Sequence, residues 1–221
     1  MNLEFRFRIL LMEPSGTFPD PMLKSRFSSD FFERDALIVS QDILGHYLVR
    51  ELNGCKIVTM IVETEAYCGV TDLGCHASGN RRTKRTEAMF LPGGYAYVYL
   101  VYGLNYCLNI VTEKKDNPHA VLIRAVEPLK GLEMIRKNRP GIKKTCDLTN
   151  GPGKLSKALD IDISLNKYDL VKGRELYLEK NPENPDFSII SAKRIGIDYA
   201  GEYKDKLWRK YIKESPFVSK K

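Results

Sequence analysis

The stretch 46-HYLVRELNGCKIVTMIVETEAY-67 decides the fold, because it reads as two β-strands joined by a tight turn. The dipeptide Asn53-Gly54 is the strongest short signal for a two-residue hairpin, since both residues tolerate a positive φ. We therefore expect a strand over residues 46–52 and a returning antiparallel strand over residues 56–67. Acids at the end of that returning strand can be positioned accurately.

The end of the returning strand carries two acids and a tyrosine on one face. Successive side chains of a strand point to opposite faces, so Glu63, Glu65 and Tyr67 lie together. The opposite face carries Val62, Thr64 and Ala66. Two acids and a tyrosine do not make a hydrophobic core, which indicates a functional face. The alternative is a solvated strand face, where glutamates are usually found.

A second alternating run, 94-GYAYVYLVYGLN-105, supplies aromatic rings. The period of two places Tyr95, Tyr97 and Tyr99 on one face and leaves Ala96, Val98 and Leu100 to pack on the other. Tyr102 comes at a turn and should project from a tip. Flat rings beside carboxylates suit a planar, polar ligand such as a nucleobase. The alternative is that tyrosines fill the strand because of their high β-propensity.

The remaining pattern predicts an α+β fold, a single mixed domain with a curved, mainly antiparallel β-sheet flanked by helices. Asp30 is the expected N-cap of a helix that ends at Gly45. Further strands are expected over residues 94–101, 106–112, 119–126, 175–178, 189–195 and 206–212, and further helices over residues 131–138 and 150–159. Residues 1–22 look like an extension, and residues 23–221 form the domain.

Composition narrows the class of partner. The 221 residues include 35 basic and 28 acidic side chains, and the net charge of +7 favours an anionic partner such as nucleic acid.

The five cysteines show no paired spacing, so we expect reduced thiols, no disulfide framework and no metal site. No apolar run approaches the roughly 20 residues of a membrane span, and we expect no signal peptide. These features predict a cytoplasmic protein that does not bind membranes.

Two basic motifs are candidates for phosphate contact. The run 81-RRTKRT-86 places four cations and two hydroxyls just before the tyrosine strand, and such clusters neutralise phosphates. Gly151-Pro152-Gly153-Lys154 lacks the hydroxyl residue of a P-loop, so it does not predict nucleoside triphosphate binding. Lys154 at a helix start is suited to one backbone phosphate. An ordinary loop entering a helix is the alternative.

A charged residue interrupts the apolar strand 120-AVLIRAV-126. Arg124 would be buried there, and a buried guanidinium needs a partner, which an active-site carboxylate would supply. An edge strand or a structural ion pair elsewhere is the alternative. Asn109 is likewise a polar residue in an apolar strand, 107-CLNIV-111, and its uncharged amide would also need a partner if it is buried.

The blocks 62-VETEAY-67, 89-MF-90 with 97-YVY-99 and 102-YG-103, 121-VLIRAVEP-128, 150-NGPGKL-155 and 215-SPFVS-219 occur in this order. Together they resemble the alkyladenine (3-methyladenine) DNA glycosylase family, the single-domain type that includes the mammalian enzyme. The resemblance implies a monofunctional enzyme of base excision repair. Such an enzyme flips a damaged purine out of duplex DNA, hydrolyses its N-glycosidic bond and leaves an abasic site.

Matching residue by residue, the resemblance assigns the catalytic group. Glu65 would activate the water, Arg124 would help position it, and the main-chain carbonyl of Val218 would hold it, with Glu63 in support. No cofactor and no metal are implied. The implied partner is double-stranded DNA with damaged purines, bound by a monomer in the cytoplasm, at the nucleoid.

The resemblance also assigns the residues that bind the base. Tyr67 would stack on one face of the flipped base, and His76 with Tyr99 on the other. The main-chain N–H of His76 would donate to the purine edge. Asn109 would exclude guanine by crowding its exocyclic amine.

DNA-binding residues follow from the same matching. Tyr102 would enter the duplex where the base has left, with Leu104 beside it in place of a methionine of the mammalian pattern. Arg81 and Thr83 would contact phosphate near the flipped nucleotide, and Lys154 would contact another phosphate.

A rival interpretation is a non-catalytic module that binds damaged DNA through stacking tyrosines and basic residues. It leaves Glu65 unexplained, because a carboxylate beside a polyanion is repulsive unless chemistry needs it. Hydrolysis of free nucleosides is a third interpretation, and it would leave the basic run and Tyr102 without a role.

Overall fold

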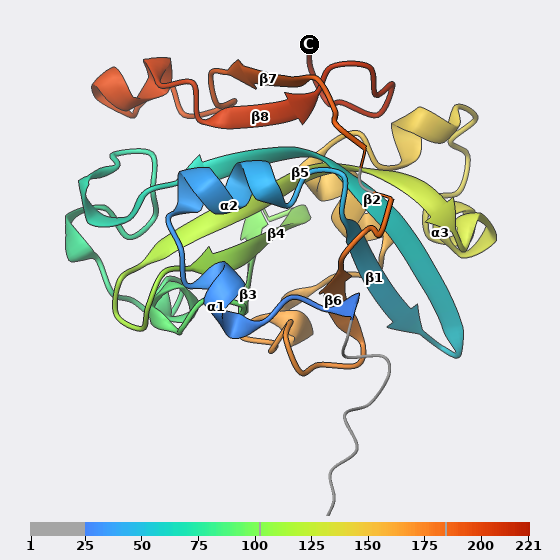
Figure 1. The fold of residues 1–221 in the computed structure, drawn as a ribbon, viewed down its shortest axis with the longest axis horizontal. Helices are drawn as coiled ribbons and strands as arrows, with labels where there is room; N and C mark the ends of the chain where they lie inside the picture. The colour runs from blue at the N-terminus through green and yellow to red at the C-terminus, as the bar shows by residue number, and fades with distance from the viewer. Residues whose placement is uncertain (1–24, 102, 184) are drawn as a thin grey trace, which may run out of the picture.

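The computed structural model describes residues 25–101, 103–183 and 185–221, and within them eight strands form one curled sheet with four short α-helices (Figure 1). Every described strand pairing is antiparallel. The predicted α+β class with a curved, mainly antiparallel sheet is confirmed. The predicted extension over residues 1–22 and the side chain of Tyr102 lie outside the described residues.

The sheet runs in the order β3-β4-β5-β2-β1-β6, and β8 joins β2 to β7. The strands are β1 Tyr47–Leu52, β2 Cys55–Tyr67, β3 Ala96–Val101, β4 Asn105–Thr112, β5 His119–Lys130, β6 Leu176–Glu179, β7 Ile189–Ala192 and β8 Arg209–Ile212. The helices are α1 Ser29–Phe32, α2 Ala36–Asp42, α3 Leu132–Asn138 and α4 Pro152–Ala158. All of the predicted strands occur, each within a few residues of its expected bounds.

The predicted hairpin is the first feature that positions the site. Asn53 and Gly54 both have positive φ, 50° and 74°, and Leu52 pairs directly with Cys55 across the turn. Positive φ at both central residues is the signature of the type I′ turn, whose twist matches that of antiparallel strands. The turn therefore fixes the register of β2, the strand that carries the acids.

β2 is the hub of the sheet because both of its edges are paired near the acids. One edge pairs with β5, and the other pairs first with β1 and then, from Glu63 to Glu65, with β8. β7 and β8, drawn in red at the top of Figure 1, thus bring the end of the chain to the acidic segment. Strands from three distant parts of the sequence meet there.

The predicted single helix from Asp30 to Gly45 is wrong. Two helices occur instead, α1 and α2, and the side chain of Asp35 rather than Asp30 caps the second by accepting the backbone N–H of Leu37 at 2.7 Å. Asp30 lies inside the first turn of α1. The apolar spacing was compatible with one continuous helix, and Asp35 interrupts it by offering the backbone a local partner.

The two faces of the strands differ as the alternation predicts. In β4, Leu108 and Ile110 are fully buried in the main core, whereas Cys107 and Asn109 line a cavity on the other face. The hydroxyl of Thr64 in β2 donates to a main-chain carbonyl of α2, so the helix covers the face opposite the acids. The expectation that Leu100 packs like Val98 is wrong, because Leu100 is 41% exposed near the end of β3.

The core lies between the sheet and the helices. It is the larger of two clusters of buried apolar side chains in the described residues, and it includes Phe32, Ile43, Ile61, Ile123 and Leu155. Helices of four to seven residues are stabilised mainly by such packing, because isolated helices of that length are unstable in water. None of the helices in the described part of the chain has the length and apolar character needed to cross a bilayer.

Candidate active site

The floor of the candidate site is a row of residues that crosses four adjacent strands. Glu65 of β2 pairs with Leu122 of β5. Leu122 also pairs with Asn109 of β4, which pairs in turn with Tyr97 of β3. Directly paired residues of antiparallel strands project to the same face. Strand register therefore brings an acid, an amide and a phenol from distant parts of the sequence onto one face.

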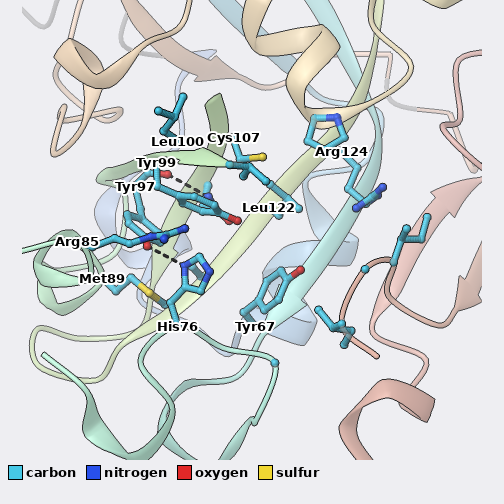
Figure 2. Close-up of a pocket in the computed structure, with 18 of the residues that line it drawn as sticks. Tyr67, His76, Arg85, Met89, Tyr97, Tyr99, Leu100, Cys107, Leu122 and Arg124 are labelled. Carbon is cyan, nitrogen blue, oxygen red and sulfur yellow. Dashed lines mark hydrogen bonds between the residues drawn. The ribbon is translucent and has the colours of Figure 1, made fainter. Parts of the chain in front are cut away.

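A cavity of about 360 Å³ lies against this row. Figure 2 shows Tyr67 on one side of the cavity and His76 with Tyr99 on the other. The centroids of the His76 and Tyr99 rings are 4.6 Å apart, and the ring planes are inclined by 71°. The structure thus brings three of the predicted base-binding residues around one space with aromatic walls. Their stacking on a base stays a prediction.

Glu65 is fully buried and held on both carboxylate oxygens. Its Oε2 accepts the hydroxyl of Tyr67 at 2.9 Å, and its Oε1 accepts the main-chain N–H of Ile195 at 2.8 Å. Burial first, and then the charge of Glu65, raise the pKa of Tyr67 well above its ordinary value. The phenol therefore stays protonated and donates to the carboxylate.

Glu63 is also fully buried, so the alternative of a solvated strand face is excluded. It accepts Nη1 of Arg209 at 2.8 Å, the main-chain N–H of Ser219 at 2.6 Å, the hydroxyl of Ser219 at 2.9 Å and Nε of Arg124 at 3.3 Å. Glu63 therefore anchors the end of the chain to the sheet. Val218, which precedes Ser219, is 7% exposed. The predicted role of its carbonyl stays a prediction.

Arg124 joins the two acids. It is 7% exposed, with Nε 3.3 Å from Glu63 and Nη1 3.2 Å from Glu65. Burial alone would lower the pKa of this guanidinium, but the charges of Glu65 and Glu63 outweigh burial and raise it. The expectation that a buried Arg124 has a carboxylate partner is confirmed, and it has two.

His76 enters the cavity from the loop that follows β2. Its Nδ1 lies 2.9 Å from the hydroxyl of Tyr97, one of the contacts drawn in Figure 2. Burial, and then the cations Arg85 and Arg81, lower the pKa of His76 to about 4. The imidazole is therefore neutral at neutral pH, and it does not repel a positively charged ring placed against it.

Asn109 forms part of the cavity wall and pairs with Tyr97 on the neighbouring strand. It is 2% exposed, and its Nδ2 donates to the main-chain carbonyl of Tyr97 at 3.1 Å. This cross-strand bond fixes the amide within the sheet. A rigid polar group in the wall suits discrimination between purines, which stays a prediction for Asn109.

The basic run beside the cavity is divided by ion pairs. Arg82 is held by Glu87 and by Asp116, each at 2.8 Å. Arg81 and Thr83 are exposed, and within the described ranges no carboxylate forms an ion pair with Arg81. The guanidinium of Arg81 is thus available to an anion in a way that the guanidinium of Arg82 is not.

Sequence reasoning missed several residues that contact the site. Arg85 lines the cavity with its guanidinium 5.0 Å from the centre of the Tyr99 ring, and the basic run was its only signal. Ile195 supplies the amide that holds Glu65, from 130 residues away. Arg209 and Ser219 hold Glu63 from 146 and 156 residues away. Ile195 and Ser219 donate through main-chain N–H groups, which every residue except proline has, so the residue type does not indicate these contacts.

The predicted DNA-contacting residues lie at the surface. Leu104, in the turn between β3 and β4, is 81% exposed. Lys154 in α4 is exposed, and its ammonium donates to the side chain of Asn150 at 2.7 Å. Both are accessible to a duplex, but their contacts with DNA stay predictions. Tyr102 lies outside the described residues.

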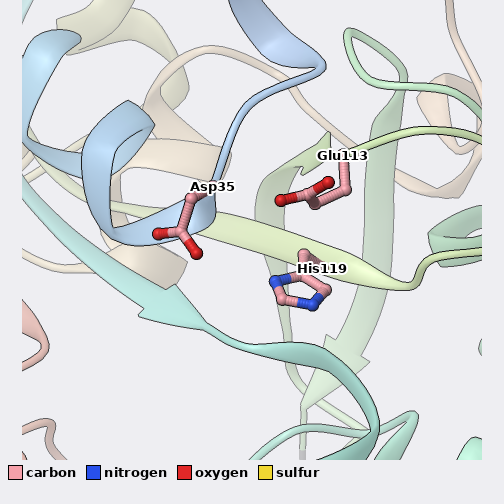
Figure 3. Close-up of side chains that lie close together, drawn as sticks. All are labelled: Asp35, Glu113 and His119. Carbon is pink, nitrogen blue, oxygen red and sulfur yellow. The ribbon is translucent and has the colours of Figure 1, made fainter.

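One group of side chains has the composition of a metal site. Asp35, Glu113 and His119 offer ligand atoms that all lie within 4.8 Å of one another (Figure 3). None of the three lines the cavity, so the candidate chemistry involves none of them.

All five cysteines are free thiols. One of them, Cys107, lines the cavity, and burial raises its pKa to about 11. The thiol is therefore protonated at neutral pH and is a poor nucleophile.

Comparison with known proteins gives one consistent result. A family model described as "Methylpurine-DNA glycosylase (MPG)" matches residues 30–216. A protein of Natranaerobius thermophilus is 57% identical over 192 residues, covering 86% of this chain and 96% of its own, and a protein of Desulfitobacterium hafniense is 47% identical over 205 residues, covering 89% and 99%. A protein of Borrelia garinii is 49% identical over 192 residues, covering 86% and 98%. All three carry the name "Putative 3-methyladenine DNA glycosylase".

Proposed function

This chain belongs to the methylpurine-DNA glycosylase family, and on that premise we propose that it hydrolyses the N-glycosidic bond of alkylated purines in duplex DNA. The observation that carries the proposal is the buried carboxylate of Glu65, which is bound by Tyr67 and Arg124, two residues that line a cavity with aromatic walls. The proposed substrate is a purine of the 3-methyladenine type. The proposed products are the free base and an abasic site.

The hydrogen-bond partners of the two acids indicate which one activates water. A carboxylate has about four lone-pair sites. Glu63 receives four donors from the described residues, three on Oε1 and one on Oε2, and two of its partner residues, Arg209 and Ser219, do not line the cavity. Glu65 receives three, from Tyr67, Ile195 and Arg124, and only Tyr67 binds Oε2. All three of these partners line the cavity, so Glu65, with a lone pair left on Oε2, is the acid placed to bind a water molecule there.

In the proposed reaction the oxygen of that water forms a bond to C1′ of the deoxyribose. Its proton passes to Glu65, and the C1′–N9 bond breaks with its electron pair going to the purine. Positive charge builds on the sugar before the new bond is complete, and a nearby carboxylate stabilises this charge. Arg124, in ion pairs with both acids, holds the carboxylate of Glu65 in position.

The cavity supports recognition of a base that has been flipped out of the helix. A purine inserted between Tyr67 and the pair of His76 and Tyr99 would gain stacking on both faces. Alkylation at a ring nitrogen makes the base cationic, which improves it as a leaving group and strengthens its attraction to electron-rich rings. The neutral state of His76 is compatible with that charge.

The test is base release from duplex DNA containing 3-methyladenine or 7-methylguanine, with a metal chelator present. We expect free base, detected by chromatography, together with a continuous strand that breaks only on later alkali treatment. Tight binding to the lesion without release would contradict the proposal and favour a non-catalytic module. Release from free nucleosides but not from duplex DNA would contradict the proposed substrate.

A further inference from the structure

The segment that holds Glu65 is itself fixed by a buried ion pair. The side chains of Arg194 and Asp72 are both fully buried, with Nη1 to Oδ2 at 2.6 Å and Nη2 to Oδ1 at 2.7 Å. This two-point contact defines orientation as well as distance. None of the proposed chemistry described above involves either residue.

On the arginine side, the pair fixes the donor to Glu65. Arg194 directly precedes Ile195, whose N–H binds Glu65 at 2.8 Å. Nη1 of Arg194 also donates to the main-chain carbonyl of Ala66 at 3.0 Å, one residue after Glu65 in β2. One guanidinium therefore ties the Ile195 segment to the strand that carries the acid, at the level of the acid.

On the aspartate side, the pair fixes the loop that carries His76. Asp72 accepts the main-chain N–H of Cys68 at 3.0 Å and that of Gly74 at 2.9 Å. These bonds hold the two ends of the short segment between β2 and His76. The loop could not keep this shape if the carboxylate turned toward another partner.

The same guanidinium lies against the stacking ring. Its carbon is 4.8 Å from the centre of the Tyr67 ring and 4.9 Å from the centre of the Trp208 ring. Burial would lower the pKa of Arg194, but the hydrogen bonds and charge of Asp72 outweigh burial and raise it. The cation is thus permanent, and it restrains the back of the side chain that forms one wall of the cavity.

From these contacts we propose that Arg194 and Asp72 act as one positioning unit, which holds the Ile195 amide on Glu65, the ring of Tyr67 and the His76 loop in register. This inference rests on the proposed base release. Neither residue touches the substrate. A buried ion pair adds little to stability compared with an apolar pair of the same volume, so its value here lies in geometry.

The test is a double-mutant cycle on the full-length chain with Arg194→Gln, Asp72→Asn and the double variant. The first measurement is the single-turnover rate constant of base release with enzyme in excess. The second is the active fraction of the enzyme, taken from the burst amplitude with lesion DNA in excess. We expect each single variant to lower the rate constant on the order of 100-fold, as misplacement of a reacting group by about 1 Å does. The double variant should be no slower than the slower single variant, because both substitutions break the same contact.

The matched control is Arg50→Gln. Arg50 is also buried, at 6% exposed, but it binds carbonyl groups of Glu51, Leu159 and Glu175 away from the cavity. We expect this control to lower the active fraction without changing the rate constant. A purely structural role for Arg194 would give the same pattern in its own variant, and that result would overturn the inference.

Two further measurements keep the test decisive. Arg194→Lys retains the charge but not the two-point contact, so it should fold and yet release base more slowly than the wild type. An unchanged rate constant in that variant would overturn the inference even if Arg194→Gln does not fold. Absence of release by the wild type would instead overturn the proposed function, so the two failures are distinguishable.

Discussion

At the scale of single residues, environment separates two acids that the sequence presents as equals. Glu63 and Glu65 lie on the same face of β2 and are equally buried. Glu63 is bound by Arg209 and Ser219, which do not line the cavity, whereas the partners of Glu65, Tyr67, Ile195 and Arg124, all line it. One acid therefore ties the end of the chain to the sheet, and the other is placed to bind a water molecule in the cavity.

His76 should make stability depend on pH. Its pKa is about 4 in the folded protein, below its ordinary value of 6.5. Between these values the unfolded chain binds more protons, so the stabilisation is complete above pH 6.5 and is lost as the pH falls toward 4. We expect the free energy of unfolding of the wild type to fall more over this range than that of His76→Gln, as measured by urea denaturation. Parallel pH profiles for the two proteins would contradict the neutral, buried imidazole.

At the scale of secondary structure, the sequence was informative where a local signal sets the geometry. Asn53-Gly54 predicted the turn and therefore the register of β2, and strict alternation predicted which side chains share a face. The prediction from the sequence failed where two local signals competed. The apolar spacing was compatible with one continuous helix, but Asp35 starts a second helix by capping it. The prediction also failed where a contact depends on distant main chain, as with the amide of Ile195 on Glu65.

The corrected helix boundary predicts a difference between two aspartates. Asp35→Ala removes the side-chain cap of α2 and should lower the free energy of unfolding by about 1 kcal/mol. Asp30→Ala should change it by less than about 0.5 kcal/mol, because Asp30 is exposed and makes no capping bond. Urea denaturation of both variants tests this. Equal losses, or a larger loss for Asp30→Ala, would favour the single helix expected from the sequence.

At the scale of the whole molecule, the positive charge is distributed so that only part of it is available to DNA. The net charge of +7 favours association with a polyanion. Within the basic run beside the cavity, Arg82 is neutralised by Glu87 and Asp116, while Arg81 is exposed and not in an ion pair with any described residue. The positive charge that a phosphate near the proposed flipped nucleotide would meet therefore depends on which arginines are in ion pairs, and not on the net charge alone.

Salt dependence of DNA binding should reveal this difference. The logarithm of the DNA-binding constant falls linearly with the logarithm of the salt concentration. Arg81→Gln should make this slope less steep by about 1, because one phosphate contact is lost. Arg82→Gln removes the same formal charge but should leave the slope nearly unchanged, since its cation is already paired. Fluorescence anisotropy on a lesion duplex over a range of salt concentrations measures both slopes. Equal reductions would show that total charge, not position, governs binding.

The central claim is that Glu65 activates the water that releases the base, and one measurement tests it most directly. The single-turnover rate of 3-methyladenine or 7-methylguanine release is compared between the wild type and Glu65→Gln, with lesion-duplex affinity measured on the same samples. Loss of a general base costs about 100- to 10,000-fold in rate, and the amide retains the shape of the carboxylate, so we expect release to fall by that factor while affinity stays close to that of the wild type. Release by Glu65→Gln at the wild-type rate would contradict the account.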